Sequence, residues 1–504
     1  MAAALLALNL GALGAVIWRA EGFGRLGPAD WAALRFTLTQ AALSALISVA
    51  LAVPVARALA RRQFPGRGAL ILVMGAPFIL PSLIAVAGIL AVFGRAGLVN
   101  QGLAAIGLPP VSPYGLQGVL LAHVFFNLPL ATRLILQGWS RVPAEHLRLA
   151  SSLGFDGWAR FRLIEAPMLA RVIPGALAVI FLICLTSFAV ALTLGGGPRA
   201  TTLELAIYQA FRFDFDLGKA ATLGLVQTAL GVAALVLLAA VWRPGLAEGG
   251  LDRAPPPGPP GAARAVDVAA ITLAGAFLLV PLAMVVWRGA LPLLSLPPQV
   301  WAAALRSLMV ALASAALLAV FAAALVTAAV LTRRAGRVFE AAGISALTAS
   351  PLVIGTGLFI LIHPVADPGR WALAVTALVN AAMALPFAIR ALLPALLRAE
   401  ADHGRLAASL GLPPSARARL IWWPALRRPA GFALGLGAAL SVGDLGVIVL
   451  FAPVGGETLP MALQRLMGAY RTTDAAGAAL LLLIMALAIF GLCERLIGGR
   501  NART

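Results

Sequence analysis

Long apolar stretches separated by short polar segments run through the whole of this 504-residue chain. A helix needs about 20 apolar residues to cross a bilayer, and twelve stretches are long enough to do so. The pattern therefore predicts an all-α integral membrane protein with about twelve transmembrane helices. We place them near residues 2–18, 37–60, 69–93, 116–138, 172–193, 221–242, 267–287, 304–331, 341–362, 371–392, 428–451 and 475–497.

One polar segment between these stretches occurs twice, 257 residues apart, at residues 143–167 and 400–424. We call the two copies the first and second repeat hairpins. In each copy, apolar positions at helical spacing lead to a glycine, which suits a helix end that needs a positive φ. A second short amphipathic helix follows, and a proline is expected to end it. The matched residues are Glu145 and Asp402, Arg148 and Arg405, Ala150 and Ala407, Gly154 and Gly411, Ile164 and Ile421, and Pro167 and Pro424.

A single hairpin of this kind is readily interpreted as a solvated loop. Two copies with the same spacing instead indicate that each part of the chain presents the same surface to a soluble partner. A Pro- and Gly-rich linker at residues 243–266 separates the copies and is not expected to form a helix. It divides the chain into a first half, residues 1–242, and a second half, residues 267–504. With six spans each, the halves enter the membrane in the same sense and form a parallel repeat.

The composition agrees with a membrane protein, because 61% of the residues are hydrophobic and only 11% are charged. The net charge of +19 is explained by sidedness, since the basic residues gather in alternate loops as the positive-inside rule describes. This rule predicts that the hairpins, the linker and both termini are cytoplasmic. No nucleic-acid partner is predicted. Cys184 and Cys493 lie far apart in apolar segments and are expected to be packing residues.

The Gly-x9-Ile-x-x-Pro spacing of both hairpins resembles the cytoplasmic loop motif of ABC importer permeases. In that family the loop forms coupling helices that dock on the ATPase subunits, so the resemblance implies that the matched residues above are ATPase-coupling residues. The chain departs from the family's Glu-Ala-Ala start, where it has Arg148-Leu149-Ala150 and Arg405-Leu406-Ala407. Glu145 or Asp402, one turn earlier, is the candidate acidic substitute.

A more specific resemblance lies in residues 185–218, 441–446 and 466–471. These segments are similar to bacterial thiamine and thiamine phosphate importer permeases, which are fused, two-domain members of the type I ABC importer group. The resemblance implies permease domains at about 36–238 and 303–495, in a bacterial inner-membrane protein. It also implies two copies of an ATPase subunit and a periplasmic thiamine-binding protein as partners. A fused ferric-iron permease is the alternative within the group, and an ion-coupled secondary transporter is the alternative outside it.

The chain itself is not expected to be an enzyme. Its only lysine, Lys219, lacks the glycine and the Ser or Thr of a phosphate-binding loop. ATP is therefore expected to be used by the partner ATPase, and we predict no catalytic residue, metal site or bound cofactor in this chain. Asp444 is the one acidic residue well inside a predicted span, and it aligns with Ser187 of the first half. It is interpreted either as a pathway residue that attracts a cationic substrate or as a polar helix-packing position.

Overall fold

The computed structural model describes residues 2–20, 26–75, 79–139, 142–155, 157–197, 200–241, 262–332, 350–453 and 455–499, and the regular structure within them is helical. The predicted linker and the start of the predicted span at 341–362 lie largely outside these ranges. In the first half the elements are α1 Ala2–Arg19, α2 Pro28–Arg61, α3 Arg67–Val73, α4 Ser82–Phe93, α5 Leu98–Ala105, α6 Leu116–Trp139, α7 Ala144–Ser152, α8 Gly157–Arg160, η3 Phe161–Glu165, α9 Ala166–Leu185, α10 Phe188–Leu194, α11 Leu203–Arg212 and α12 Leu217–Val241. In the second half they are α13 Ala262–Gly289, η5 Pro292–Ser295, α14 Pro298–Leu331, α16 Pro351–Ile362, α17 Pro368–Ser409, α18 Pro414–Arg417, η7 Ala418–Trp422, α19 Trp423–Val442, α20 Ile448–Phe451, α21 Leu459–Gly468 and α22 Thr472–Gly498.

Among the described residues, nine helical stretches are long and apolar enough to cross a membrane. This agrees with the prediction of a polytopic membrane protein. Three of the twelve predicted spans, at 2–18, 341–362 and 428–451, have no counterpart among the nine, so twelve spans stay a prediction. The nine stretches are Pro28–Arg61, Ser82–Ala105, Leu116–Trp139, Gly157–Leu185, Leu217–Leu237, Ala263–Gly289, Pro298–Leu331, Pro368–Ser409 and Thr472–Gly498.

Several predicted spans are not continuous helices. The span expected at 172–193 is broken between α9 and α10, and the span expected at 428–451 is broken between α19 and α20. The stretch at 69–93 is likewise divided between α3 and α4. Hydrophobicity averaged over a whole span does not reveal such breaks, because the apolar residues on both sides outweigh the few polar ones. The position of Asp444 is therefore corrected: it lies in a turn after α19, and not inside a helix.

Several elements of the two halves match in length, so these can be aligned residue by residue without gaps. The helices α2 and α14 each have 34 residues and begin with proline. The helices α4 and α16 each have 12 residues, and α9 and α19 each have 20. One contact also recurs: the first amide of α11, at Leu203, donates to Thr37 Oγ1 at 2.8 Å. The first amide of α21, at Leu459, donates to Ser307 Oγ at 2.9 Å, and both hydroxyls stand tenth in their helices.

The first helix of each half packs against the other half. α1 lies against α16, and α13 lies against α4. In both contacts a glycine permits close approach, since a Cβ on Gly357 would meet the Ala12 carbonyl oxygen, and one on Gly88 would meet that of Pro281. The largest cluster of buried apolar residues draws on both halves. The two halves therefore share a core rather than touching at a polar surface.

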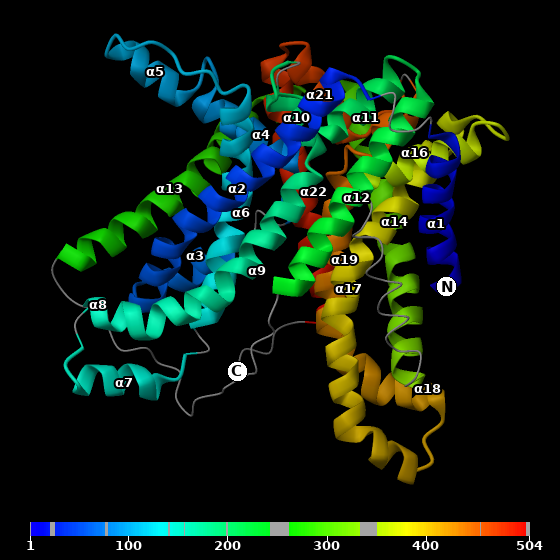
Figure 1. The fold of residues 1–504 in the computed structure, drawn as a ribbon. Coiled ribbons are helices and arrows are strands. Elements are labelled where there is room, and N and C mark those ends of the chain that lie inside the picture. The colour runs from blue at the N-terminus through cyan, green and yellow to red at the C-terminus, as the bar shows by residue number, and fades with distance from the viewer. Residues whose placement is uncertain are drawn as a thin grey trace.

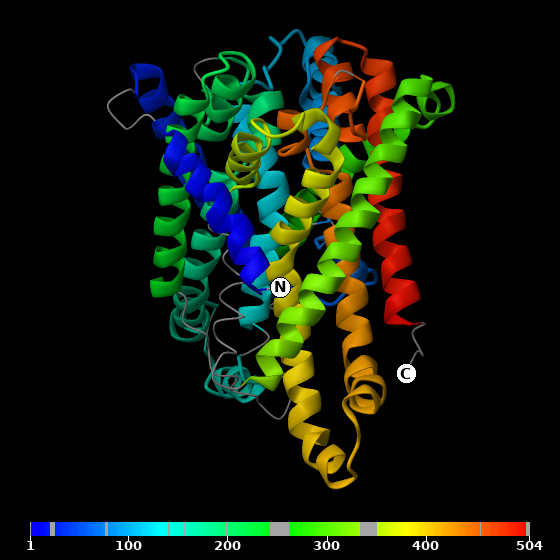
Figure 2. The ribbon, with the colours of Figure 1, turned by 90° about the vertical axis from the view of Figure 1, so that its right-hand side faces the viewer.

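Both repeat hairpins lie at the same end of the helix bundle. Figure 1 shows α7, α8 and α18 at this end, and α5, α10, α11 and α21 at the opposite end. In the second view the lower part of α17 and the α18 region extend from the bundle at this same end (Figure 2). The repeated polar segments thus form two separate projections at one end of the protein.

Candidate functional site

The two hairpins turn through the same hydrogen-bonded helix end. Gly154 has φ +67° and Gly411 has φ +61°. The amide after each glycine reaches back to a carbonyl five residues earlier, from Phe155 to Ala150 at 2.9 Å and from Leu412 to Ala407 at 3.0 Å. This bond is the mark of a Schellman helix end, whose left-handed residue is most often glycine. The predicted need for glycine at both turns is confirmed.

Each hairpin then returns through a π-helical segment of five residues, η3 in the first and η7 in the second. The segments join α8 to α9 and α18 to α19 without a break. Pro167 and Pro424 lie in the first turn of α9 and α19, where a missing N–H is tolerated. The expectation that these prolines end the second hairpin helix is therefore wrong. The helix continues through them into the membrane-spanning segments.

The hairpins differ where they begin. In the first, α6 ends at Trp139 and α7 starts separately at Ala144. In the second, α17 runs without interruption from Pro368 to Ser409 and forms the first arm itself. The first hairpin has Pro143 where the second has Glu400. Because a proline restricts itself and the residue before it, this exchange favours a new helix start in the first half only.

The matched residues of the hairpins divide in the same way in both copies. Ala150 and Ala407 are buried, and Ile164 and Ile421 are half-buried. The remaining matched positions are exposed, among them both acidic candidates, Glu145 and Asp402. Three leucines in each copy are also exposed, by 57 to 64% of their surface. They are Leu149, Leu153 and Leu163 in the first hairpin and Leu406, Leu410 and Leu420 in the second.

The carboxylates that hold the hairpins in place are Glu165 and Glu400, which the sequence analysis did not single out. Glu165 is buried in η3 and accepts from Arg57 Nε at 2.7 Å and from Arg61 at 2.5 Å. Glu400 in α17 accepts from Arg417 Nε at 3.0 Å and from the Trp422 indole N–H. The one sequence signal for these ion pairs is that an arginine occurs at the same position in both copies, as Arg160 and Arg417.

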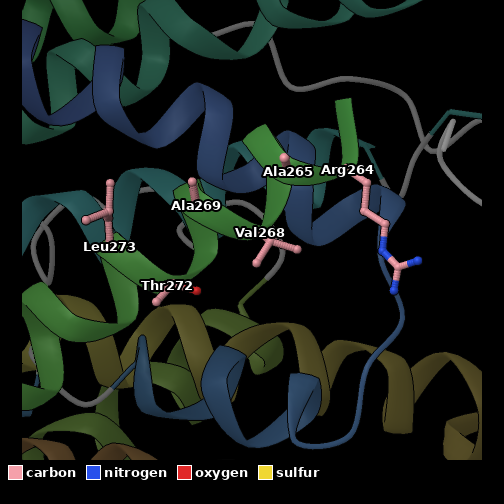
Figure 3. Close-up of a pocket in the computed structure, with 6 residues that line it drawn as sticks. All are labelled: Arg264, Ala265, Val268, Ala269, Thr272 and Leu273. Carbon is pink, nitrogen blue, oxygen red and sulfur yellow. The ribbon is translucent and has the colours of Figure 1, made fainter. Parts of the chain in front are cut away.

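A cavity of about 490 Å³ lies inside the second hairpin, between α17 and the start of α19. It brings together five residues of the second repeat hairpin, Asp402, His403, Leu420, Ile421 and Pro424. The mixture of charged and apolar walls suits a protein side chain better than a free ion. A second hollow, of about 700 Å³, lies beside the first turns of α13 (Figure 3). All six of its lining residues belong to that one helix, so we assign it no ligand.

Polar groups of each half meet at the break that follows α9 or α19. In the first half, His123 Nε2 and Ser187 Oγ are joined by a hydrogen bond of 2.7 Å, and His123 Nδ1 and Ser44 Oγ by one of 3.0 Å. The residues at the same positions of the second half are Asn380, Asp444 and Ser314. Of these two trios, only Ser187 and Asp444 were candidates from the sequence.

The second trio has unused hydrogen-bonding capacity. Asn380 Nδ2 donates to Ser441 Oγ at 3.0 Å and lies beside the Asp444 carboxylate. Asp444 Oδ1 accepts from the Gly446 amide at 3.1 Å. Within the described residues, Asp444 Oδ2 and Ser314 Oγ are buried and have no hydrogen-bond partner. A buried oxygen of this kind is costly unless something binds it.

The break after α19 also touches the other half. A Cβ added to Gly443 would lie 2.4 Å from the ring of Pro81, at the start of α4. Irregular backbone at membrane depth is tolerated only where it is buried in protein or lines a cavity. Two breaks at matched positions, each carrying a polar side chain, therefore lie where the backbone is buried in protein or lines a cavity.

Glu204, in the first turn of α11, is a third acidic residue that the sequence analysis missed. It is buried, accepts a hydrogen bond from Ser350 of the second half, and burial raises its pKa to about 7. Its Oε1 has no hydrogen-bond partner among the described residues. Pro460 stands at this position in α21, so a carboxylate here is not needed to form the repeated helix.

Comparisons with known proteins find relatives over nearly the whole chain. The thiamine transport system permease protein ThiP of Brucella abortus is 43% identical over 511 residues, which cover 99% of this chain and 93% of that protein. ThiP of Escherichia coli is 41% identical over 488 residues, or 94% of this chain and 90% of that protein. The molybdenum transport system permease ModB of Azotobacter vinelandii is 27% identical over 178 residues, 35% of this chain and 78% of its own. No family model matches the chain.

Proposed function

This chain belongs to the family of thiamine transport system permease proteins, and on that basis we propose that it is the membrane subunit of an ATP-driven thiamine importer. A permease is a transport component rather than an enzyme, so hydrolysis of ATP falls to separate subunits. We infer a complex of one chain of two six-helix halves, two copies of an ATPase subunit on the cytoplasmic side, and a periplasmic thiamine-binding protein. The complex would lie in the bacterial inner membrane with both termini of this chain in the cytoplasm.

The observation that carries this proposal is the repeated exposed surface of the hairpins. The same three leucines are exposed in each copy, around the same Schellman turn. Exposed apolar side chains that gather in one patch mark interaction sites on proteins. Two equal patches at one end of the bundle fit two equal partners, as in an ATPase dimer. We therefore assign the matched residues of both hairpins to ATPase coupling.

The continuous helices below the hairpins suggest how docking reaches the pathway. Residues 157–185 form one helical rod from the first hairpin to the break before Ser187. Residues 414–442 form the matching rod to the break before Asp444. When ATP brings two ATPase subunits together, the hairpins approach each other. Each continuous helical stretch then moves with its hairpin and displaces the non-helical segment at its far end. Alternation between inward-facing and outward-facing states follows from this movement.

The substrate proposal rests on the charge at the second break. Thiamine contains a positively charged thiazolium ring, and Asp444 Oδ2 is an unpartnered acceptor beside the contact between the halves. A carboxylate at a constriction of low dielectric constant lowers the barrier for a cation. Ser187 supplies the matched neutral group on the other side. Neither alternative from the sequence analysis, a ferric-iron permease or an ion-coupled transporter, gains support from the relatives.

The stoichiometry of the complex tests the docking proposal. Native mass spectrometry of the detergent-solubilised complex is expected to show one permease chain with two ATPase chains, because each hairpin presents one docking surface. The permease purified without its partner gives the reference mass for this measurement. A complex of two permease chains with two ATPases, one hairpin of each left empty, would contradict the pairing of two docking surfaces within one chain.

A further inference from the structure

Buried ion pairs attach the first repeat hairpin to α2, a helix outside the hairpin. The side chain of Glu165 is 1% exposed and lies between Arg57 and Arg61 of α2, at 2.7 and 2.5 Å. Arg160 of α8 is 3.7 Å from the same carboxylate. The Arg57 guanidinium also lies over the Phe161 ring, 5.3 Å from its centroid. One hairpin residue thus joins three arginines from two separate elements.

The link continues from α2 to the second half of the chain. Arg62, which follows Arg61, pairs with Asp267 of α13 at 2.7 Å, and both side chains are largely buried. The first hairpin, α2 and α13 are therefore connected in series by ion pairs. Breaking a buried pair by removing one partner is strongly unfavourable, because the other charge is left uncompensated. The three elements are consequently expected to resist separation.

Among the described residues, the second half has neither the carboxylate nor the two spanning-helix arginines of this link at the aligned positions. Because α2 and α14 align residue by residue, Arg57 and Arg61 correspond to Thr327 and Leu331. Glu165 corresponds to Trp422 in η7. Neither a carboxylate nor an arginine remains at these positions. Within the part of the chain that the structure describes, an ion pair between hairpin and spanning helix occurs in the first half and not in the second, although the elements around it are repeated.

The second hairpin is held by a different ion pair. Arg417, the counterpart of Arg160, pairs with Glu400, and the Trp422 indole donates to the same carboxylate. Glu400 belongs to α17, which is the first arm of that hairpin. This contact closes the hairpin on itself and does not reach α14. The arginine at this position therefore pairs with different carboxylates in the two halves. Arg160 pairs with Glu165 in η3, and Arg417 pairs with Glu400 in α17.

We propose that Glu165 is a positioning residue that makes α2, and through Arg62 and Asp267 also α13, move together with the first coupling loop, whereas the ion pair of the second loop holds it to α17 and not to α14. This inference rests on the proposed function, because it concerns how ATPase closure reaches the membrane helices. The two halves then transmit the same ATPase movement by different routes. A merely structural anchor would stabilise the chain but would not alter the coupling between hydrolysis and uptake.

The functional test compares Glu165→Gln with the unchanged chain in vesicles that contain the ATPase and the binding protein. The substitution leaves the exposed leucines of the docking surface in place, so the complex is expected to assemble and hydrolyse ATP. Thiamine taken up per ATP hydrolysed is expected to fall roughly 2- to 30-fold, the range for a residue within a coupling network. Glu400→Gln is the matched control and is expected to lower this ratio less, because no second spanning helix is released.

A distance measurement reads the proposed movement directly. Spin labels at Gln63, after α2, and Ser152, at the end of α7, are expected to keep one distance with and without ATP. Labels at two comparable second-half sites, Thr332 directly after α14 and Ser409 at the end of α17, are expected to change their distance. Cys493 is first replaced by alanine, since it is only half-buried. In Glu165→Gln the first distance is expected to become ATP-dependent as well.

Arg57→Gln repeats both measurements if Glu165→Gln fails to insert, because Arg57 is the most exposed partner, with 30% of its side chain accessible. An unchanged uptake ratio together with an unchanged Gln63–Ser152 distance in the variant would overturn the proposal. An ATP-dependent Gln63–Ser152 distance in the unsubstituted chain would overturn it too. Failure of the unsubstituted chain to bind the ATPase would instead contradict the proposed function, so the two failures are distinguishable.

Discussion

Replacing both Gly154 and Gly411 with valine is expected to abolish ATP-driven uptake while the chain still inserts in the membrane. Both glycines have positive φ, and a left-handed conformation costs an ordinary residue about 1–2 kcal/mol and a β-branched residue more. A Cβ at either position meets no atom within 4 Å, so the cost is in the backbone turn rather than in a clash. Misdirected hairpins would lose ATPase binding, measured by co-purification and by stimulated hydrolysis.

Two controls separate the turn from general damage to the hairpin. Gly154→Asn with Gly411→Asn is expected to retain much of the activity, because asparagine adopts the left-handed conformation more readily. Gly157→Val changes a glycine of the same hairpin that does not have a positive φ and has open space around it, and it is expected to have a small effect. Full coupled uptake by the double valine variant would remove the hairpins from the account of docking.

Asp444→Asn is expected to slow thiamine uptake at least about tenfold, since a unit charge about 4 Å away is worth up to about 4 kcal/mol at an intermediate dielectric constant. Asparagine keeps the shape and one acceptor but removes the charge. The Gly446 amide still has its acceptor, so the turn after α19 is expected to persist. Uptake is measured at saturating binding protein, with expression level and basal ATPase activity recorded beside it.

Ser187→Ala is the matched change in the first half and is expected to have a smaller effect, because no charge is lost. It removes the 2.7 Å hydrogen bond to His123, so it also tests whether the hydrogen-bonded trio of Ser44, His123 and Ser187 is needed for uptake. Unchanged uptake in Asp444→Asn would favour the packing interpretation, in which the residue only fills the turn beside Pro81. Equal losses in both variants would indicate a requirement for polarity rather than for negative charge.

The hairpins were predictable from sequence because their determinants are local. Gly154 and Gly411 each end a short helix within a few residues, and the repeat showed that the spacing was meaningful. The same reasoning failed at Pro167 and Pro424, since a π-helical segment just before each proline lets the helix continue. Local rules for proline assume an ordinary α-helix, and nothing in the residue pattern predicted the π-helical segments η3 and η7.

The contacts across the fold were not predictable from one sequence. Glu165 pairs with arginines 104 and 108 residues away. Because Trp422 occupies the aligned position in the second copy, the repeat gave no reason to select Glu165. The break before Asp444 follows a long apolar helix, and Pro81 of the other half packs closely against Gly443 at this point. Asn380 and His123 became candidates only when the matched helices placed them beside Asp444 and Ser187.

Uptake of labelled thiamine into vesicles that contain this chain, its ATPase and the thiamine-binding protein tests the central claim most directly. The account predicts uptake that requires ATP and the binding protein together and continues after ion gradients are abolished. Ferric iron supplied with the same components is expected not to enter. Thiamine uptake driven by an ion gradient without ATP, or ATP-driven entry of ferric iron in place of thiamine, would contradict the account.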